Sequence, residues 1–386
     1  MRQIEDYLIK QGKRVIYFSV DQELTNPILS DPRYLLRFLK DQEDVSANNP
    51  AFILLDEFQY IKAPGLFLKV LFDLSSDYLQ VIATGSSALE ISKEKEFLTG
   101  RKIEFIMERF SFIEFLRASS SHKYNYQWKV GDSFADLSEF YQVYRKDLEQ
   151  HCLEYINWGG YPEVSLTRNN MKKETILKEI ISTYTQKDVS DFLKVENISG
   201  FNRLVVVLAM QVGNLINKNE IANTLGINYR TLNSYLDILR HTFIYSFLPP
   251  YYSNIRKELA KMPKVYADDL GIVRFATGAA TSEYSMIPGN LAENFVFLHL
   301  KNFGNIYFYR THSGGEIDFL IKESADFIPV EVKFSKKPQL PRMMKNFSRT
   351  YPVLHQIVLT RDMIAQEKST YFIPLPVLPF IDPCGF

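Results

Sequence analysis

The chain has 386 residues, of which 46% are hydrophobic, and it carries 45 basic and 45 acidic side chains. Its length suits two or three domains, its hydrophobic content excludes a largely disordered chain, and no apolar run approaches the ~20 residues of a membrane helix. The balanced charge excludes a uniformly basic nucleic-acid-binding protein, so a DNA surface has to be a local patch.

The first ten residues are charged and amphipathic, and they do not have the pattern of a signal peptide. The two cysteines, Cys152 and Cys384, stand far apart and form neither a disulfide framework nor a zinc motif. Together these features predict a cytoplasmic protein without a membrane partner.

The first third of the chain alternates predicted helices and strands. Helices are expected at residues 2–11, 34–40 and 111–118, and strands at 14–20, 51–56, 80–85 and 102–108. The strands are continuous apolar runs, which are typical of a parallel sheet that is covered on both faces. The sequence therefore predicts an α/β domain over residues 1–118.

The rest of the chain has a different pattern. Residues 119–135 are polar and predict a loop, and residues 136–250 predict a mostly helical region. Within that region, residues 217–244 have helix-turn-helix spacing that is broken at Gly226. Residues 251–386 predict an α+β domain. Its expected elements are a helix near 290–303 and strands at 305–310, 316–321, 327–333 and 355–360.

The strand at 51–56 ends in two carboxylates, Asp56 and Glu57, within FILLDEFQY. In a nucleotide hydrolase, the first carboxylate of such a pair holds Mg²⁺ through water and the second polarises the attacking water. Thr84, at the end of the next strand, would then lie beside the γ-phosphate, with Ser86 in the turn that follows. The alternative is an ordinary buried strand that ends at a surface turn.

Several segments resemble one known family and follow its order. They are ILLDEFQYI, VIATGSSALEI, LTGRKIEFIMERFSFIEFL, YINWGGYPEV, YTQKDVSDFL, RKELAKMPKVYADDLG and RTHSGGEIDFLI with IPVEVK. This set, which covers nearly the whole chain, resembles the AAA-type ATPases that carry a C-terminal DUF4143-like domain of uncharacterised function. The resemblance implies a P-loop NTPase-like sheet with ATP and Mg²⁺ as cofactors. Arg101, in LTGRK, is a candidate cation for the phosphates of its own or a neighbouring subunit. In the second case the protein would be a homo-oligomer.

The phosphate-binding loop of that family is missing from the sequence. Family members begin with a strand and a GxxxxGK[ST] loop, whereas this chain starts at what resembles the first helix, and its only early glycine is Gly12. The missing strand would lie between those at 80–85 and 102–108, and its absence would leave unpaired backbone groups. We therefore expect impaired ATP binding and an N-terminally truncated chain, through a misplaced start or gene damage, or else a degenerate paralogue.

The second helix of the helix-turn-helix segment carries polar side chains that can reach base edges or phosphates. They are Asn228, Tyr229, Arg230, Asn233 and Ser234. These residues predict a winged-helix-like module that contacts DNA, in which Arg230 supplies a cation. The alternative is a lid-like helical bundle that packs on the ATPase core and touches no DNA.

The C-terminal region concentrates acidic residues and a lysine in EIDFLIKESADFIPVEVKF. Glu331 and Lys333 are two residues apart and therefore lie on one face of a strand. Asp318 and Glu331 are predicted to bind a divalent ion with Glu293 as a further group, while Lys333 steadies the attacking water. This arrangement resembles the restriction-endonuclease-like fold and implies a metal-dependent nuclease. The alternatives are carboxylates that face water, or a scaffold that binds DNA without cleaving it.

A basic run follows these strands and suits a phosphate backbone. It contains Lys336, Lys337, Arg342, Lys345 and Arg349, with Arg310 shortly before. The basic segment 256–264, RKELAKMPK, is instead expected to be a solvated helix end, the alternative being a segment that faces phosphate.

The sequence thus predicts an α/β protein of three parts that acts on DNA. They are a P-loop NTPase-like AAA core at 1–118 without its first strand, a helical and winged-helix region at 136–250, and an α+β, restriction-endonuclease-like domain at 251–386.

Overall fold

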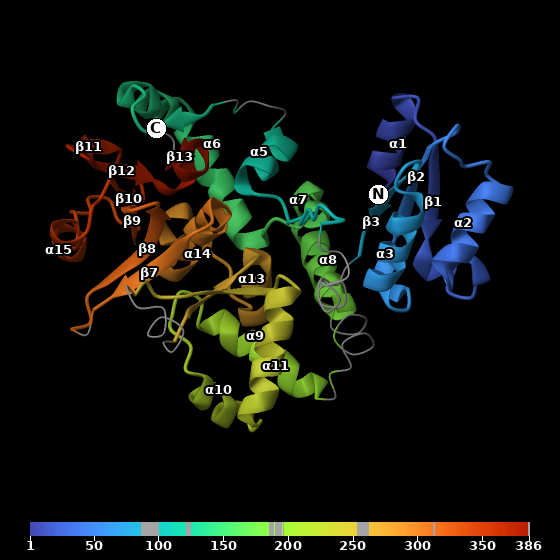
Figure 1. Cartoon of the computed structure of the whole chain (residues 1–386). Coiled ribbons are helices and arrows are strands. Elements are labelled where there is room, and N and C mark those ends of the chain that lie inside the picture. The colour runs from blue at the N-terminus through green and yellow to red at the C-terminus, as the bar shows by residue number, and fades with distance from the viewer. Residues whose placement is uncertain are drawn as a thin grey trace. The chain divides into compact units, whose positions relative to one another are not determined.

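Figure 1 shows the fold in a computed structural model, which describes residues 1–85, 100–120, 124, 126–184, 189, 195, 197–252, 262–311 and 313–384. The chain divides into two compact units, Met1–Met107 and Glu108–Phe386. Each unit has a hydrophobic core of its own. The units are described separately below.

The first unit is built on a parallel sheet. Its strands lie in the order β1 (Val15–Ser19), β2 (Ala51–Asp56), β3 (Leu79–Ala83), and its helices are α1 (Arg2–Lys10), α2 (Pro32–Asp41) and α3 (Pro64–Ser75). The central strand β2 is the most covered, and Ile53, Leu54 and Leu55 are fully buried. The predicted strands at 14–20, 51–56 and 80–85 are therefore confirmed, although β1 lies at the edge and buries only Phe18.

The strand predicted at 102–108 is wrong. Residues 102–110 adopt no helix or strand, and the side chains of Ile103, Phe105 and Met107 are 83%, 82% and 91% exposed. A strand persists only where a neighbour satisfies its backbone N–H and C=O groups. No described strand pairs with this segment or with the free edge of β3. The alternating apolar side chains therefore stay on the surface.

The second unit begins with a series of helices. They are α5 (Phe112–Ser120), α6 (Phe134–Trp158), α7 (Pro162–Leu166), α8 (Asn170–Thr183), α9 (Ile198–Met210), α10 (Lys218–Leu225) and α11 (Tyr229–His241). Gly226 ends α10 in the left-handed conformation, with φ at 65°. Asn228 caps α11, because its side-chain oxygen accepts a hydrogen bond from the Thr231 N–H at 2.8 Å. Two helices joined by a tight turn therefore occupy the predicted helix-turn-helix segment.

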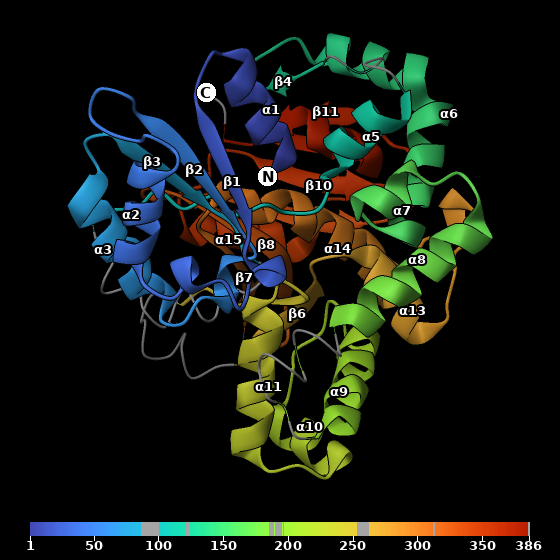
Figure 2. The same ribbon diagram turned by 90° about the vertical axis from the view of Figure 1, so that its right-hand side faces the viewer.

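A small antiparallel pair of strands follows these helices. β5 (Tyr245–Leu248) pairs with β6 (Lys264–Ala267), and Leu215, just before α10, forms a further antiparallel bridge with Lys264. Figure 2 shows α9, α10 and α11 grouped together, with β6 next to them. This pairing ties the helical region to the start of β6.

The C-terminal part of the second unit is a six-stranded sheet that carries helices on both faces (Figure 1). α14 (Gly289–Leu300) packs on the face that contains Phe319, and α15 (Arg342–Thr350) packs on the face that contains Leu320. The predicted strands at 305–310, 316–321, 327–333 and 355–360 are confirmed. In spatial order the sheet contains β11 (Ala365–Glu367), β12 (Thr370–Pro374), β10 (Gln356–Thr360), β9 (Asp326–Lys333), β8 (Glu316–Glu323) and β7 (Ile306–Arg310).

A buried carboxylate fixes the other end of β6. Asp269, between β6 and α13 (Leu270–Thr277), accepts hydrogen bonds from the backbone N–H groups of Gly160 at 2.7 Å and Gly271 at 2.8 Å. Gly159, at the C-terminal end of α6, leaves room for this carboxylate, since a Cβ at that position would overlap Asp269. Asp269 therefore ties the segment after β6 to the residues that follow α6 and to the start of α13.

Candidate functional site

The carboxyl end of the parallel sheet gathers polar side chains around Asp56. The Asp56 carboxylate accepts a hydrogen bond from the Tyr17 hydroxyl at 2.6 Å and another from the Thr84 hydroxyl. Tyr17, Asp56 and Thr84 come together because they stand at or near the ends of three adjacent parallel strands. Burial raises the pKa of Asp56, but the hydrogen bonds from Thr84 and Tyr17 outweigh burial, and the net pKa shift is downward. Asp56 is therefore ionised at neutral pH.

Glu57 follows Asp56 in a left-handed backbone conformation, with φ at 53°. Such a conformation is costly for a residue other than glycine, and it often marks a site where a side chain has to be aimed. The Glu57 carboxylate accepts a hydrogen bond from the Gln59 amide at 2.5 Å. Glu57 is half-buried and directly follows Asp56 in the chain.

Two other predicted residues of this site have different outcomes. Arg101 forms an ion pair with Asp73 of α3, with its Nε 2.8 Å from the carboxylate oxygen. Its predicted role toward phosphates stays a prediction. Ser86 lies outside the described residues.

A second polar cluster lies in the other unit, around Lys264. Its ammonium Nζ is 2.8 Å from Glu293, 2.6 Å from Glu316 and 3.7 Å from Asp318. Lys264 is only 2% exposed, so this ammonium is almost fully removed from water. Glu293, on α14, also accepts a hydrogen bond from the Tyr266 hydroxyl at 2.5 Å.

Asp318 and Glu331 face each other across β8 and β9. The Asp318 carboxylate accepts a hydrogen bond from the Val332 N–H at 2.9 Å, and the Glu331 carboxylate accepts one from the Asp318 N–H at 3.3 Å. Lys333 pairs with Glu331, with its Nζ 2.7 Å from the carboxylate, and remains 47% exposed. The structure thus brings together all four residues predicted here, Glu293 included.

The charges of this cluster shift one another's pKa. Burial, followed by the charge of Asp318, raises the pKa of Glu331 to about 7. The same two causes raise the pKa of Glu293. Burial lowers the pKa of Lys264, but the carboxylates of Glu293, Asp318 and Glu316 outweigh burial, so its net pKa shift is upward. Lys264 is therefore a permanent positive charge at neutral pH.

The two sites differ in how well they suit a metal ion. An ionised Asp56 flanked by hydroxyl groups offers the hard oxygen donors that Mg²⁺ prefers, so that site fits this ion. In the second cluster, Lys264 already supplies the positive charge. Across the described parts of the chain, no group of three or more His, Cys, Asp or Glu side chains is arranged to hold a metal ion. The metal-binding roles predicted for Asp318, Glu331 and Glu293 stay predictions.

Comparison with known protein families shows which domain contains each of the two sites. Residues 1–116 match a family described as "AAA domain", and residues 288–378 match one described as "Domain of unknown function (DUF4143)". The chain therefore contains an AAA domain and, toward its C-terminal end, a DUF4143 domain. The AAA domain holds Asp56 and Glu57, and the DUF4143 domain holds all the carboxylates of the second cluster. Residues 149–283 match a "Domain of unknown function (DUF8612)", and this part supplies Lys264.

Relatives of this AAA-type protein occur in bacteria and archaea. An uncharacterized protein of Haemophilus influenzae is 26% identical over 353 residues, which cover 86% of this chain and 78% of the relative. One from Methanocaldococcus jannaschii is 25% identical over 379 residues, covering 94% of this chain and 77% of the relative. A second protein of that organism is 26% identical over 311 residues, covering 78% of this chain and 64% of the relative.

The predicted DNA-contacting side chains of the AAA-type protein are on its surface. Arg230 is exposed near the start of α11, whereas Asn233 is held by Lys218, whose ammonium donates to its side-chain oxygen at 2.8 Å. Five basic residues are also exposed on α15 and just before it, and none forms an ion pair with another described residue. They are Lys336, Lys337, Arg342, Lys345 and Arg349.

Sequence reasoning missed three residues that complete the sites, and one expectation was wrong. Lys264 belongs to the segment 256–264 that was expected to be solvated, yet it is buried. A signal was present, because Lys264 and Tyr266 alternate with apolar residues in KVYA and so share one face of a strand. Glu316, two residues before Asp318, carries the same signal. Tyr17 carried no such signal, since it lies within an apolar strand.

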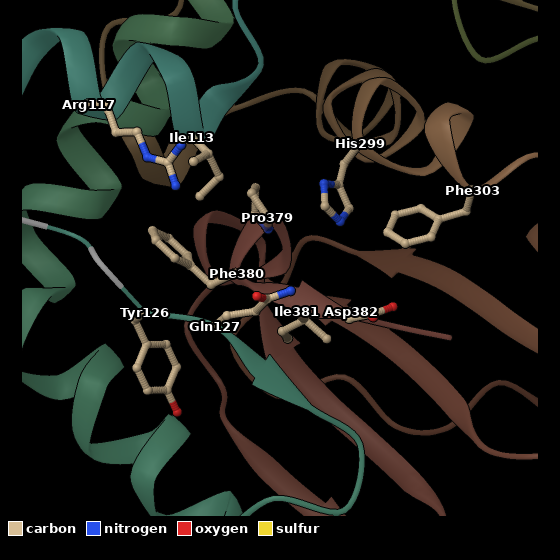
Figure 3. A pocket seen from close by; sticks show the side chains of 10 residues that line it. All are labelled: Ile113, Arg117, Tyr126, Gln127, His299, Phe303, Pro379, Phe380, Ile381 and Asp382. Atoms are coloured by element: carbon tan, nitrogen blue, oxygen red, sulfur yellow. The ribbon is translucent and has the colours of Figure 1, made fainter. Parts of the chain in front are cut away.

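A separate pocket of about 510 Å³ lies beside α5 and α14 (Figure 3). Arg117 reaches toward it from α5, His299 comes from α14, and Phe380 and Asp382 come from the C-terminal segment. Burial lowers the pKa of His299 to about 4, so its imidazole is neutral at pH 7. None of the predicted site residues lines this pocket.

The helices that the structure describes include none of the length and apolar character needed to cross a membrane.

Proposed function

We propose that this protein is a nucleotide-dependent member of its AAA family, with Asp56 as the residue that holds Mg²⁺ through water and Glu57 as the residue that polarises the attacking water. The observation that carries this proposal is the ionised Asp56 at the end of the central strand, bonded to Thr84 of the next strand. Thr84 would contact the γ-phosphate, and Mg²⁺ would neutralise the developing phosphate charge.

Nucleotide binding by these 386 residues is expected to be weak. The sequence contains no GxxxxGK[ST] loop, so it lacks the backbone N–H groups and the lysine that surround the phosphates in such sites. Titration with a fluorescent ATP analogue and Mg²⁺ tests this: we expect no saturation below about 1 mM, against the micromolar affinities at which such sites are usually saturated. Micromolar binding would contradict the proposal of impaired binding.

The role of Glu57 is tested after a strand and a GxxxxGK[ST] loop from a family relative have been fused ahead of Met1. The fused chain is expected to hydrolyse ATP, and Glu57→Gln is expected to reduce turnover by two orders of magnitude or more, roughly the contribution of a positioned general base. Glu43→Gln, at a half-buried carboxylate of the same domain that pairs with Arg14, serves as the control. Unchanged turnover in Glu57→Gln would remove Glu57 from the mechanism.

The second candidate function is DNA binding by the C-terminal part of the chain. The observation that favours it is the exposed basic group on and before α15, whose cations have no acidic partner among the described residues. Arg342, Lys345 and Arg349 are spaced three and four residues apart, so they project from one side of α15. The helices α10 and α11, followed by β5 and β6, suit a winged-helix module that adds a second contact through Arg230.

We favour binding over cleavage for this domain, because the Lys264 ammonium already lies among Glu293, Glu316 and Asp318, where a nuclease would hold its metal ion. Incubation of supercoiled plasmid with the protein and Mg²⁺ or Mn²⁺ distinguishes the two. Intact plasmid, with DNA binding retained, supports a scaffold. Metal-dependent nicking that disappears in both Asp318→Ala and Lys333→Ala would instead establish a nuclease.

A further inference from the structure

The cluster around Lys264 is assembled from parts of the chain that belong to different sequence families. The lysine stands at the start of β6, in the part that matches DUF8612, whereas its carboxylate partners lie on α14 and β8 in the DUF4143 domain. β6 is fixed at both ends, by the bridge from Leu215 to Lys264 and by Asp269 after its last residue. The position of the Lys264 backbone, and with it the region that its ammonium can reach, is therefore fixed.

The contacts of the ammonium match those of a bound cation. Three carboxylates from two elements, Glu293 from α14 and Glu316 and Asp318 from β8, converge on one positive centre. The two shorter distances, 2.8 and 2.6 Å, are those of charge-assisted N–H···O bonds rather than of metal–oxygen bonds. The ring of Phe308, 5.6 Å from Nζ, adds an aromatic face to the site.

Burial makes this charge balance important. A buried carboxylate without a partner is strongly destabilising, and so is a buried ammonium. Glu293 is removed from most of the solvent, and among the described residues its carboxylate pairs with Lys264 and Tyr266, so its negative charge depends on Lys264. Lys333, which is 47% exposed, pairs with Glu331 and does not replace Lys264 at Glu293.

We propose that Lys264 is the resident cation of the DUF4143 domain: its ammonium occupies the place of a divalent metal ion, so the carboxylates of Glu293, Glu316 and Asp318 hold no metal in the native chain, and removing the ammonium turns them into a Mn²⁺ or Mg²⁺ site. This inference does not depend on nucleotide or DNA binding, because its test measures only stability and bound metal.

The test compares the melting temperature of the full chain with EDTA and with Mn²⁺, followed by tryptophan fluorescence. Both tryptophans, Trp128 and Trp158, lie in the second unit, so the signal reports the unit that contains Lys264. For the wild type we expect equal melting temperatures in the two conditions. For Lys264→Ala we expect a lower melting temperature in EDTA and a rise of about 5 °C with Mn²⁺ at about 100 times its Kd.

Two variants control the comparison. Lys333→Ala removes an exposed lysine near the same carboxylates and is expected to show no response to Mn²⁺. Lys264→Ala combined with Asp318→Asn is expected to lose the response of the single variant. If Lys264→Ala does not fold, Lys264→Gln, which keeps a hydrogen-bond donor, replaces it in the same assay.

Two results would overturn the inference. The first is a wild-type chain that melts at a higher temperature with Mn²⁺ than with EDTA, because a metal ion would then bind despite Lys264. The second is a folded Lys264→Ala or Lys264→Gln variant that shows no response to Mn²⁺ and retains no metal after desalting.

Discussion

The charge state and role of single side chains in this protein depend on partners that lie far away in the sequence. Asp318, Glu331 and Lys333 could be predicted as a group, because period-two spacing in two apolar strands places them on one face. The same spacing placed Lys264 and Tyr266 on one strand face, but the burial of Lys264 could not be predicted, because lysine is almost never buried without partners and those partners are supplied by separate elements. The metal-binding role of the carboxylates was predicted from the period-two spacing alone. That Lys264 places its own positive charge among them can be seen only in the tertiary structure.

At this scale, Glu331 is predicted to make the second unit less stable as the pH rises. Its folded pKa is raised from 4.5 to about 7, so the folded state binds the proton more tightly than the unfolded state. The resulting stability is fully present below pH 4.5 and is lost as the pH rises through 7. Urea unfolding, followed by tryptophan fluorescence at pH 4.5 and 7.5, measures this loss.

In the wild type, the free energy of unfolding is expected to fall by an amount on the order of 1–3 kcal/mol between these pH values, since a shift of one pKa unit corresponds to about 1.4 kcal/mol. Glu331→Gln is expected to remove this fall. Glu367→Gln, at an exposed position on β11, is expected to keep the wild-type pH dependence. Identical pH profiles for the wild type and Glu331→Gln would show that this carboxylate does not carry the effect.

At the scale of elements, the sequence predicted most helices and strands but not how they are paired. Apolar runs identified β1, β2 and β3, and Gly226 with Asn228 identified the turn between α10 and α11. The strand predicted at 102–108 has the right alternation but lacks a neighbouring strand, and pairing cannot be read from one segment. The short elements β6, α13 and α15 were not predicted from the sequence. Their apolar side chains can be recognised as one face only when the C-terminal sheet and α6, against which they pack, are known.

The junction between α6 and α13 is predicted to depend on the absence of a side chain at Gly159. Gly159→Ala forces a methyl group into the Asp269 carboxylate and is expected to lower the free energy of unfolding by more than about 3 kcal/mol. Gly278→Ala is a control for positive φ after a helix, with ψ at 4° in place of the −166° of Gly159, and nothing lies within 4 Å of an added Cβ.

The control is expected to lose only about 1–2 kcal/mol, the cost of a left-handed alanine. Urea unfolding of both variants measures the difference. Equal losses would mean that backbone strain, and not the space taken by Asp269, makes glycine necessary at position 159.

The segment 102–108, which pairs with no described strand, is predicted to be an exposed hydrophobic surface that promotes aggregation. Replacing Ile103, Phe105 and Met107 by serine should decrease binding of a hydrophobic dye and slow aggregation, with a change in unfolding free energy within about 0.5 kcal/mol, because these side chains are exposed. Leu71→Ser, at a fully buried position of the same unit, should instead unfold it. Unchanged dye binding in the triple variant would mean that these side chains are covered in solution.

At the scale of the whole molecule, an AAA domain with an ionised Asp56 precedes a part that carries an exposed basic helix. The neutral net charge of the chain hides this asymmetry, because the cations of α15 form no ion pair with another described residue, whereas Arg33 and Arg37 of α2 pair with neighbouring carboxylates. The expectation of a local patch could be formed from the sequence. The location of that patch on one side of one helix required the fold.

The most direct test of DNA association is a fluorescence anisotropy titration of labelled duplex DNA at about 50 mM and about 200 mM salt. We expect binding that weakens steeply with salt. Replacing Arg342, Lys345 and Arg349 by glutamine should make the negative slope of log K against log salt shallower by about 2–3, because that many phosphate contacts are lost. Neutralising Arg33, Arg37 and Lys40 on α2, which changes the net charge equally, should leave the slope unchanged. An affinity that is absent at low salt, or that is the same at both salt concentrations, would contradict the account.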